Sequence, residues 1–322
     1  MKRLSSITLL AINLSIGSAL AADKIRVGYF PNITHAQALI GLADGTFQKT
    51  LGSDATIETK VFNAGPSAIE ALFADAIDLT YVGPGPAING YVRSEGEVRI
   101  VSGACVGGAA LVVRNDIAVK NPQDLHGKKI ATPQLGNTQD IAARVYLKKN
   151  GLMPVEKGGD VQILPIANPD QLTLFLQKSL DAAWAPEPWA TRLVREGNGR
   201  VLIDERTLWP NGRFATTVVL VRKKFLDQHP DVVKRWLAGH TQVTKWIKQH
   251  PGEARVITGR EIKRLTTKAL PDAELAEAWG HLEFTTDPVP ASITTMAQGA
   301  YELGFLHEKP DVGPLIDLTL LK

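Results

Sequence analysis

The chain contains two weakly similar halves, and this internal repeat constrains its fold more than any other feature. Residues 64–87, AGPSAIEALFADAIDLTYVGPGPA, align without gaps on residues 167–190, ANPDQLTLFLQKSLDAAWAPEPWA. Upstream, KIRVGYFPNITHAQA (24–38) is similar to KIATPQLGNTQDIAA (129–143) at nearly the same offset. Such self-similarity indicates that one structural unit occurs twice.

Each half alternates short apolar runs with helix signals. Pro66 and Pro169 lie where proline favours the first turn of a helix. Thr34 is the predicted N-cap of a helix in the first half, and Asn137 or Thr138 caps the corresponding helix in the second. This order predicts an α/β protein with two doubly wound parallel sheets, one in each half.

Two β-branched runs end in arginine, ALVVR (110–114) and TVVLVR (217–222). We interpret them as paired crossover strands that leave and re-enter the first lobe. Lobe 1 then comprises residues 22–113 and 217–322, and lobe 2 comprises 114–216. The periodic apolar residues after Pro230 predict a helical tail on lobe 1. Two lobes joined by two strands form a hinge with a ligand cleft between them.

The N-terminus has the composition of a secretory signal peptide. Lys2 and Arg3 precede an apolar run, and Ala19-Leu20-Ala21 offers a cleavage site before Ala22. Residues 1–21 are therefore predicted to be removed in a periplasmic protein, with no membrane insertion after cleavage. The apolar run is too short for a good membrane span.

The remaining composition excludes several classes of function. The chain of 322 residues has a formal net charge of +3 and no basic block, which argues against nucleic acid as a partner. A single cysteine, Cys105, excludes an internal disulfide and a thiolate metal cluster. No nucleotide-binding loop, nucleophile elbow or histidine cluster is present, so we expect neither an enzyme, nor a cofactor, nor a metal.

Ligands of open α/β sheets bind beyond the carboxyl ends of the strands, where helices begin. This rule selects the turns at 31–35, 82–86, 107–108, 136–139 and 185–189. Free N–H groups at helix starts bind anions, and small hydroxyl and amide side chains stand beside them. The resulting candidates for an oxyanion site are Asn32, Thr34, Asn137, Thr138 and Gln139.

Other residues in these turns allow two interpretations. Thr34 and Thr138 are ligand contacts or helix caps only. His35 is a donor to the anion or an exposed first-turn histidine. The Gly83-Pro84 turn either lets the backbone approach a ligand or is merely tight.

The turn of the second half that corresponds to the Gly83-Pro84 turn is the elbow from Trp184 to Trp189, and it carries larger side chains. Trp184 and Trp189 form a wall against a ligand or belong to the core. Glu187 lies between two prolines and requires a partner, which is either a ligand amine or hydroxyl or an arginine of the other lobe.

The opening KIRVGYFPNITHAQAL, the segment FNAGPSAIEALFADAIDLTYVGPGPAI, SGA…GGAALVVR and the elbow LDAAWAPEPWA together identify a family. The chain resembles the periplasmic substrate-binding proteins of ABC importers, in the branch that serves aliphatic sulfonates, taurine and nitrate. The resemblance covers nearly the whole mature chain. Its D-x-x-Y-V-G-P and D-A-A-W-x-P-E-P elements are specific to the branch but not to one ligand.

This resemblance implies a two-lobed, type II binding protein that captures a small anionic solute and delivers it to a membrane permease. It places the pocket at Pro31–His35, Gly83-Pro84, Gly108, Asn137-Thr138 and Trp184–Glu187. We expect a monomer whose ligand is an aliphatic sulfonate or taurine. Nitrate, a phosphonate and a thiamine-precursor pyrimidine remain alternatives, as does a role in presenting ligand to a sensor kinase.

Overall fold

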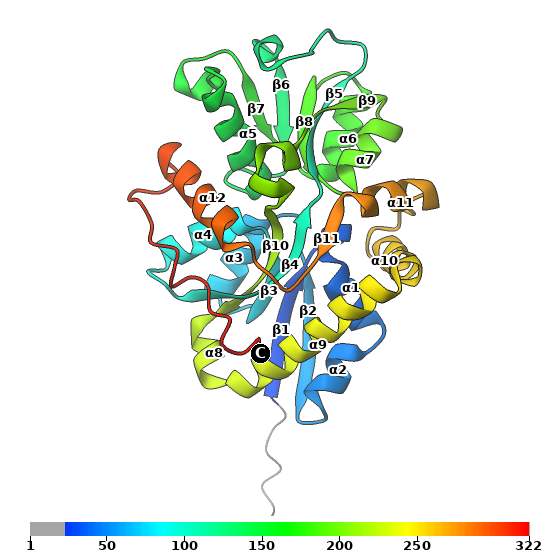
Figure 1. Cartoon of the computed structure of the whole chain (residues 1–322), viewed down its shortest axis with the longest axis vertical. Coiled ribbons are helices and arrows are strands. Elements are labelled where there is room, and N and C mark those ends of the chain that lie inside the picture. Colours follow the sequence, from blue (N-terminus) through cyan, green and yellow to red (C-terminus); the bar gives the residue numbers. More distant parts are fainter. Residues whose placement is uncertain (1–22, 322) are drawn as a thin grey trace, which may run out of the picture.

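The computed structural model describes residues 23–321, and the predicted signal peptide lies outside this range. The chain forms two lobes, each built on one β-sheet with helices packed against it, stacked along the long axis of the molecule (Figure 1). The prediction of a two-lobed α/β fold is confirmed.

Lobe 1 contains a six-stranded sheet. Its strands, in spatial order, are β11 (Leu282–Phe284), β4 (Val98–Gly107), β10 (Ala215–Arg222), β3 (Leu79–Val82), β1 (Asp23–Tyr29) and β2 (Ala55–Val61). Its helices are α1 (Ala36–Ala43), α2 (Thr46–Leu51), α3 (Gly65–Phe73), α4 (Pro84–Arg93), α8 (Lys223–Gln228), α9 (Pro230–Gln249), α10 (Pro251–Thr266), α11 (Asp272–Gly280) and α12 (Pro290–Glu302).

Lobe 2 contains a five-stranded sheet. Its strands, in spatial order, are β7 (Gln162–Pro165), β6 (Lys129–Thr132), β8 (Ala182–Pro186), β5 (Ala109–Arg114) and β9 (Gly199–Asp204). Its helices are α5 (Thr138–Lys149), α6 (Asn168–Leu176) and α7 (Trp189–Arg195). Short 3-10 helices lie in connections of both lobes: Ile33–His35 in lobe 1, and Pro122–Leu125, Val155–Lys157, Glu205–Leu208 and Pro210–Gly212 after the chain has entered lobe 2.

The two repeats form equivalent parts of the two sheets. Strand β1 pairs in parallel with β2 and β3, and β6 pairs in parallel with β7 and β8. Next to each trio lies an antiparallel strand, β10 in lobe 1 and β5 in lobe 2. The predicted parallel strands are present in both sheets, but each sheet also contains antiparallel strands that the prediction did not include, so the sheets are mixed.

The two arginine-ended runs do not pair with each other. Strand β5, which contains ALVVR, lies wholly in lobe 2 between β8 and β9, and β10, which contains TVVLVR, lies in lobe 1 between β3 and β4. They occupy equivalent positions in different sheets. The chain crosses between the lobes at Gly107-Gly108 and within 205–214, rather than at Arg114 and Thr217.

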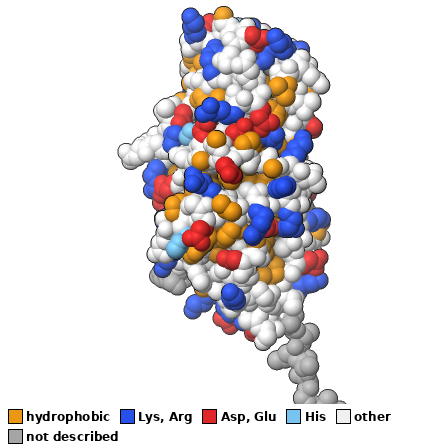
Figure 2. All heavy atoms as spheres, turned by 90° about the vertical axis from the view of Figure 1, so that its right-hand side faces the viewer, with side chains coloured by type: hydrophobic (Ala, Val, Ile, Leu, Met, Phe, Trp, Pro, Cys, Tyr) orange, Lys and Arg blue, Asp and Glu red, His pale blue; other side chains and the backbone are white. Residues whose placement is uncertain are grey.

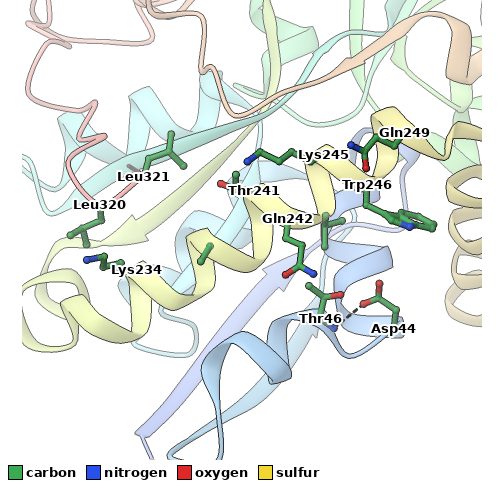
Figure 3. Close-up of a pocket in the computed structure, with 12 residues that line it drawn as sticks. Asp44, Thr46, Lys234, Thr241, Gln242, Lys245, Trp246, Gln249, Leu320 and Leu321 are labelled. Carbon is green, nitrogen blue, oxygen red and sulfur yellow. Dashed lines mark hydrogen bonds between the residues drawn. The ribbon is translucent and has the colours of Figure 1, made fainter.

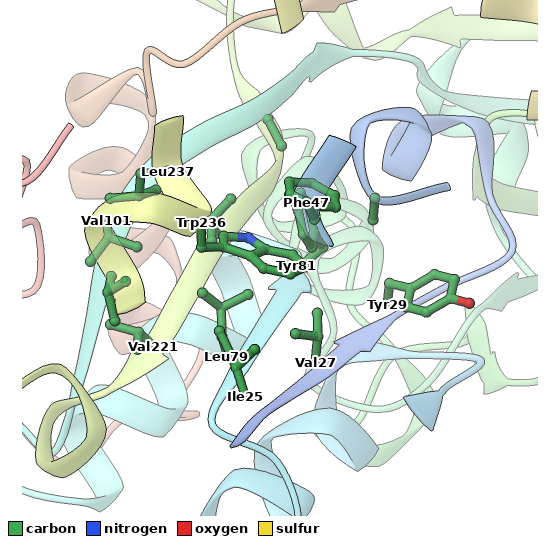
Figure 4. Close-up of a cluster of buried hydrophobic side chains, with 14 of the residues drawn as sticks. Ile25, Val27, Tyr29, Phe47, Leu79, Tyr81, Val101, Val221, Trp236 and Leu237 are labelled. Carbon is green, nitrogen blue, oxygen red and sulfur yellow. The ribbon is translucent and has the colours of Figure 1, made fainter. Parts of the chain in front are cut away.

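The helical tail covers lobe 1 as predicted. Trp236 of α9 is fully buried and stacks on Phe47 of α2, with ring centroids 3.9 Å apart. Both rings lie over apolar side chains of β1, β3 and β10 (Figure 4). The predicted apolar positions on α9 are all buried: Val233, Trp236, Leu237, Val243 and Ile247. The tail thus completes the core of the lobe in which the chain begins.

The surface carries charges of both signs. On the face that includes α10 and α11, Lys and Arg side chains are interspersed with Asp and Glu (Figure 2). No helix within residues 23–321 has the length and apolar character to cross a membrane.

Candidate functional site

A small cavity of about 30 Å³ lies between the two lobes at the carboxyl ends of their parallel strands. Lobe 1 lines it with Phe30, Asn32, Thr34, His35, Asn63, Ala64, Gly65, Gly83, Pro86, Thr216 and Thr217. Lobe 2 lines it with Pro133, Asn137, Thr138, Gln139, Asn168 and Pro186. None of these residues is Lys, Arg, Asp or Glu.

Several helices begin at this cavity. The first residues of α3, α4, α5 and α6, or the residues just before them, are among its walls, as is the 3-10 helix Ile33–His35. Helix starts carry unpaired N–H groups and the positive end of the helix dipole. The start of α4 contributes its dipole but no free N–H, because Pro84 and Pro86 lack one and the Gly85 N–H donates to Thr138 Oγ1. The converging dipoles and the neutral side-chain donors suit an oxyanion without a charged side chain.

His35 contributes a neutral imidazole. It is buried, and this burial lowers the pKa of His35 to about 3. Its Nδ1 accepts a hydrogen bond from the Phe30 backbone N–H at 3.3 Å, so Nε2 carries the proton and is the ring's donor. The exposed-histidine interpretation was wrong, because His35 is buried and lines the cavity.

The lobes touch directly around the cavity. Thr138 Oγ1 of lobe 2 accepts a hydrogen bond from the Gly85 N–H in the first turn of α4, at 3.2 Å. A second hydrogen bond joins the lobes, since Trp189 Nε1 of lobe 2 donates to Asn32 Oδ1 of lobe 1 at 3.1 Å. The structure is therefore a closed form, and a solute with a tail requires the lobes to move apart in order to enter.

The start of α5 is held from behind by a buried carboxylate. Asp140 is fully buried and accepts hydrogen bonds from Gly136 N–H and Thr132 Oγ1, each at 2.9 Å. It also pairs with Arg144 one turn later. Asn137 Oδ1 accepts from the Asp140 N–H, which confirms Asn137 as the predicted N-cap. Asp140 thereby sets the path of the loop that brings residues 137–139 to the cavity.

Glu187 faces away from this cavity. Its carboxylate accepts from the N–H and hydroxyl of Thr191 and lies 2.6 Å from Nδ1 of His281, which follows α11 in lobe 1. Glu187 has a structural partner in lobe 1, as one of the two interpretations required, but this partner is a histidine and not an arginine, and the two form an ion pair when His281 is protonated. Gly108 lies beside it, and its carbonyl accepts the Glu187 N–H at 2.8 Å. Both residues line a separate cavity of about 120 Å³.

Three further predicted residues have other places or roles. Trp184 is 1% exposed in the core of lobe 2, where its Nε1 donates to Glu205 Oε2 at 2.7 Å. Pro84 is buried in the first turn of α4 and is not among the cavity walls. Thr34 lines the cavity but makes no capping hydrogen bond, so its predicted role as an N-cap was wrong.

The structure brings all five predicted oxyanion residues together at the interlobe cavity. The predicted residues at the cavity are Asn32, Thr34, His35, Gly83, Asn137, Thr138 and Gln139. Trp189 lines an adjoining cavity of about 120 Å³. The prediction missed Asn63 and Asn168, which stand at the starts of α3 and α6, and Thr216 and Thr217 on β10. The turns after β2 and β7 satisfy the same strand-end rule and would have revealed both asparagines.

Comparison with known proteins places this architecture in a family. Residues 18–260, more than half of the chain, match the NMT1-like family. The chain belongs to the NMT1-like family. A taurine-binding periplasmic protein of Escherichia coli K12 is 30% identical over 228 residues, which cover 70% of this chain and 67% of that protein.

Solved structures share the fold of this NMT1-like chain. The alkanesulfonate-binding protein SsuA from Xanthomonas axonopodis pv. citri, bound to MOPS, superimposes with a TM-score of 0.76 at 19% identity, covering 91% of this chain and 98% of that one. The nitrate-binding protein NrtA from Synechocystis PCC 6803 gives a TM-score of 0.73 at 16% identity, covering 93% and 87%. At these identities, the likeness shows the shared fold.

A larger groove of about 790 Å³ lies elsewhere on the NMT1-like chain, along the outer side of α9 (Figure 3). Its walls include Lys234, Gln242 and Trp246 of α9, Asp44 and Thr46 near α2, and Leu320 and Leu321 at the C-terminal end. All of them belong to lobe 1, so movement of lobe 2 does not open or close this groove. Size alone does not make it the better candidate site.

The pair Glu187–His281 predicts that lobe closure in this NMT1-like protein depends on pH. The hydrogen bond to Glu187 raises the pKa of His281 in the closed form above its ordinary value of 6.5, with nearby Asp204 raising it further and Arg206 opposing it. Protonated His281 therefore stabilises the closed form relative to the open form. This stabilisation is fully present below pH 6.5, and it is lost as the pH rises through the raised pKa of His281.

Ligand affinity is therefore expected to be about two- to fivefold lower above the raised pKa of His281 than below pH 6.5. The expected change is small because the pair is partly exposed to solvent. Titration calorimetry between pH 5.5 and about 8.5 measures the change. His281→Asn should give a flat profile, since His35 and His240 have pKa values lowered by burial to about 3 and about 4. An unchanged slope in His281→Asn would show that another group is responsible.

Proposed function

We propose that this chain is the periplasmic solute-binding component of an ABC import system, and that it captures a small organic oxyanion by closure of its lobes. The single observation that carries the proposal is the convergence of four α-helix starts on an interlobe cavity with no charged side chain in its walls. The proposed ligand class is the aliphatic sulfonates, and the expected partner is a membrane permease that receives the solute.

The geometry supports capture rather than turnover. The histidine at the cavity is neutral, and its Nδ1 is occupied by a backbone N–H. Both lobes supply donors, so a bridging oxyanion stabilises the closed form over the open one. A full switch between open and closed populations requires about 5.5 kcal/mol of preference for the closed form. The taurine-binding relative and the sulfonate-binding SsuA structure agree with this ligand class.

A thermal-shift screen of the chain from Ala22 onward, unfolded and refolded to remove carried-over solute, tests this function. The panel contains alkyl sulfonates, nitrate, sulfate, an alkyl phosphonate and a thiamine-precursor pyrimidine. A sulfonate at a hundred times its Kd should stabilise the protein by about 2.7 kcal/mol. Stabilisation by the pyrimidine alone, or by no compound at all, would contradict the proposed ligand class.

A further inference from the structure

The oxyanion cavity continues into a second space that has a distinct chemical character. The adjoining cavity of about 120 Å³ shares three walls with the first one, Asn32, Asn63 and Asn168. A ligand whose anionic head lies among the helix starts therefore extends its far end past three asparagine amides. The second cavity is also lined by residues of α7 and of the segment after α10, among them Trp189, Arg192 and Lys268.

The walls of the two cavities carry no carboxylate among the residues that the structure describes. Glu187 lies between Pro186, a wall residue of the first cavity, and Pro188, a wall residue of the second. Its side chain, however, belongs to neither cavity and pairs with His281. The charged side chains in the walls are Arg192 and Lys268. Arg192 lies over the Trp189 ring, 4.8 Å from its centroid, and pairs with Glu196, which is not a wall residue. Lys268 is exposed at the rim.

Two buried polar groups remain without partners at this site. Oδ1 of Asn168 and Oγ1 of Thr217 are inaccessible to solvent and make no hydrogen bond within residues 23–321. Asn168 is 4% exposed and belongs to both cavities. Buried polar groups without partners are costly in a native structure, and a bound molecule that hydrogen-bonds them removes the cost.

We infer that the site prefers a small sulfonate whose far end is a hydroxyl or another uncharged hydrogen-bonding group, and that it discriminates against a far-end ammonium. This inference rests on the proposed function. A hydroxyl satisfies the Asn168 amide as donor and acceptor. An ammonium can only donate, to Asn168 Oδ1, and it loses its hydration without gaining a carboxylate in the cavity walls.

Isethionate and taurine form a matched pair of probes, because they differ only in a hydroxyl and an ammonium at the far end. Titration calorimetry of the refolded protein at neutral pH should give a Kd for taurine at least about tenfold higher than for isethionate. Ethanesulfonate, which has the same head and no polar far end, serves as the third probe.

The outcomes separate the two proposals. Taurine binding as tightly as isethionate, or more tightly, overturns the inference and leaves the proposed function standing. Failure of all three sulfonates to bind overturns the proposed function and, with it, the inference.

Asn168→Asp provides a gain-of-function test. The substitution keeps the shape of the side chain and places a carboxylate in the first turn of α6, where the helix dipole favours negative charge. The ratio of taurine to isethionate affinity should rise by about tenfold or more, even as the added charge weakens both sulfonates. The ratio is independent of any general loss of binding.

Asn211→Asp is the matched control, because Asn211 is exposed and lies outside both cavities. It adds the same charge and should leave the ratio unchanged. A ratio in Asn168→Asp equal to that of the control would overturn the placement of the far end at Asn168.

Discussion

Replacement of Gly83 by valine is expected to weaken ligand binding by at least about a hundredfold while leaving each lobe folded. Gly83 has an extended backbone, φ −69° and ψ 152°, that valine adopts readily. The obstacle lies in the other lobe, since a Cβ at this position would overlap Thr138 Oγ1 and lie 3.2 Å from Thr138 Cβ. The substitution therefore acts against the closed form, and apparent affinity falls with the population of that form.

Titration calorimetry with a sulfonate, together with circular dichroism of the free protein, measures the two effects separately. Gly252→Val is the control, because a Cβ at Gly252 in α10 meets no atom within 4 Å. It should bind like the parent protein. Parent-like affinity in Gly83→Val would show that the ligand does not bind between Gly83 and Thr138.

Local signals in the sequence predicted the elements that frame the site. Pro66 and Pro169 occupy the first turns of α3 and α6, and Asn137 caps α5, because these roles depend only on neighbouring residues. The convergence of strand ends followed from the α/β order, which is why Asn32 and Gly83 were selected correctly as residues of one cavity.

Long-range pairings had no local signal. Trp184 finds its partner at Glu205, and Glu187 finds His281, which is 94 residues away. An aromatic and acidic elbow at the end of a strand predicts a ligand wall and a structural corner equally well. The arginine-ended runs were similarly ambiguous. Two β-branched runs can be paired strands of one sheet or equivalent strands of two different sheets, and both arrangements require the same composition.

The missed asparagines have a different cause. Asn63 and Asn168 stand in turns after the edge strand of each sheet, β2 and β7, and a proline follows each of them within three residues. The prolines were interpreted only as helix signals. The two asparagines lie near the starts of helices that face the cleft, and Asn137 was selected for the same physical reason.

Asp140→Ala is expected to reduce the free energy of unfolding by about 3–5 kcal/mol, the largest stability effect expected at the site. The substitution removes the acceptor for Gly136 N–H and Thr132 Oγ1, and it leaves buried Arg144 paired only with Glu156, a half-exposed carboxylate. Denaturant unfolding measures the loss. Asp227→Ala is the control, because Asp227 is exposed and pairs at the surface with Lys223, so its removal should cost at most about 1 kcal/mol.

The same substitution tests whether the cavity depends on its support as well as on its walls. Asp140 is not among the wall residues of the cavity, yet its bond to Gly136 fixes the loop that presents Asn137 and Thr138. Sulfonate affinity should therefore fall in Asp140→Ala even at temperatures where the variant is fully folded. Asp140→Asn keeps one acceptor oxygen and should lose less of both stability and affinity. A folded Asp140→Ala variant with parent affinity would show that the closed interface alone positions Thr138, through its contact with Gly85.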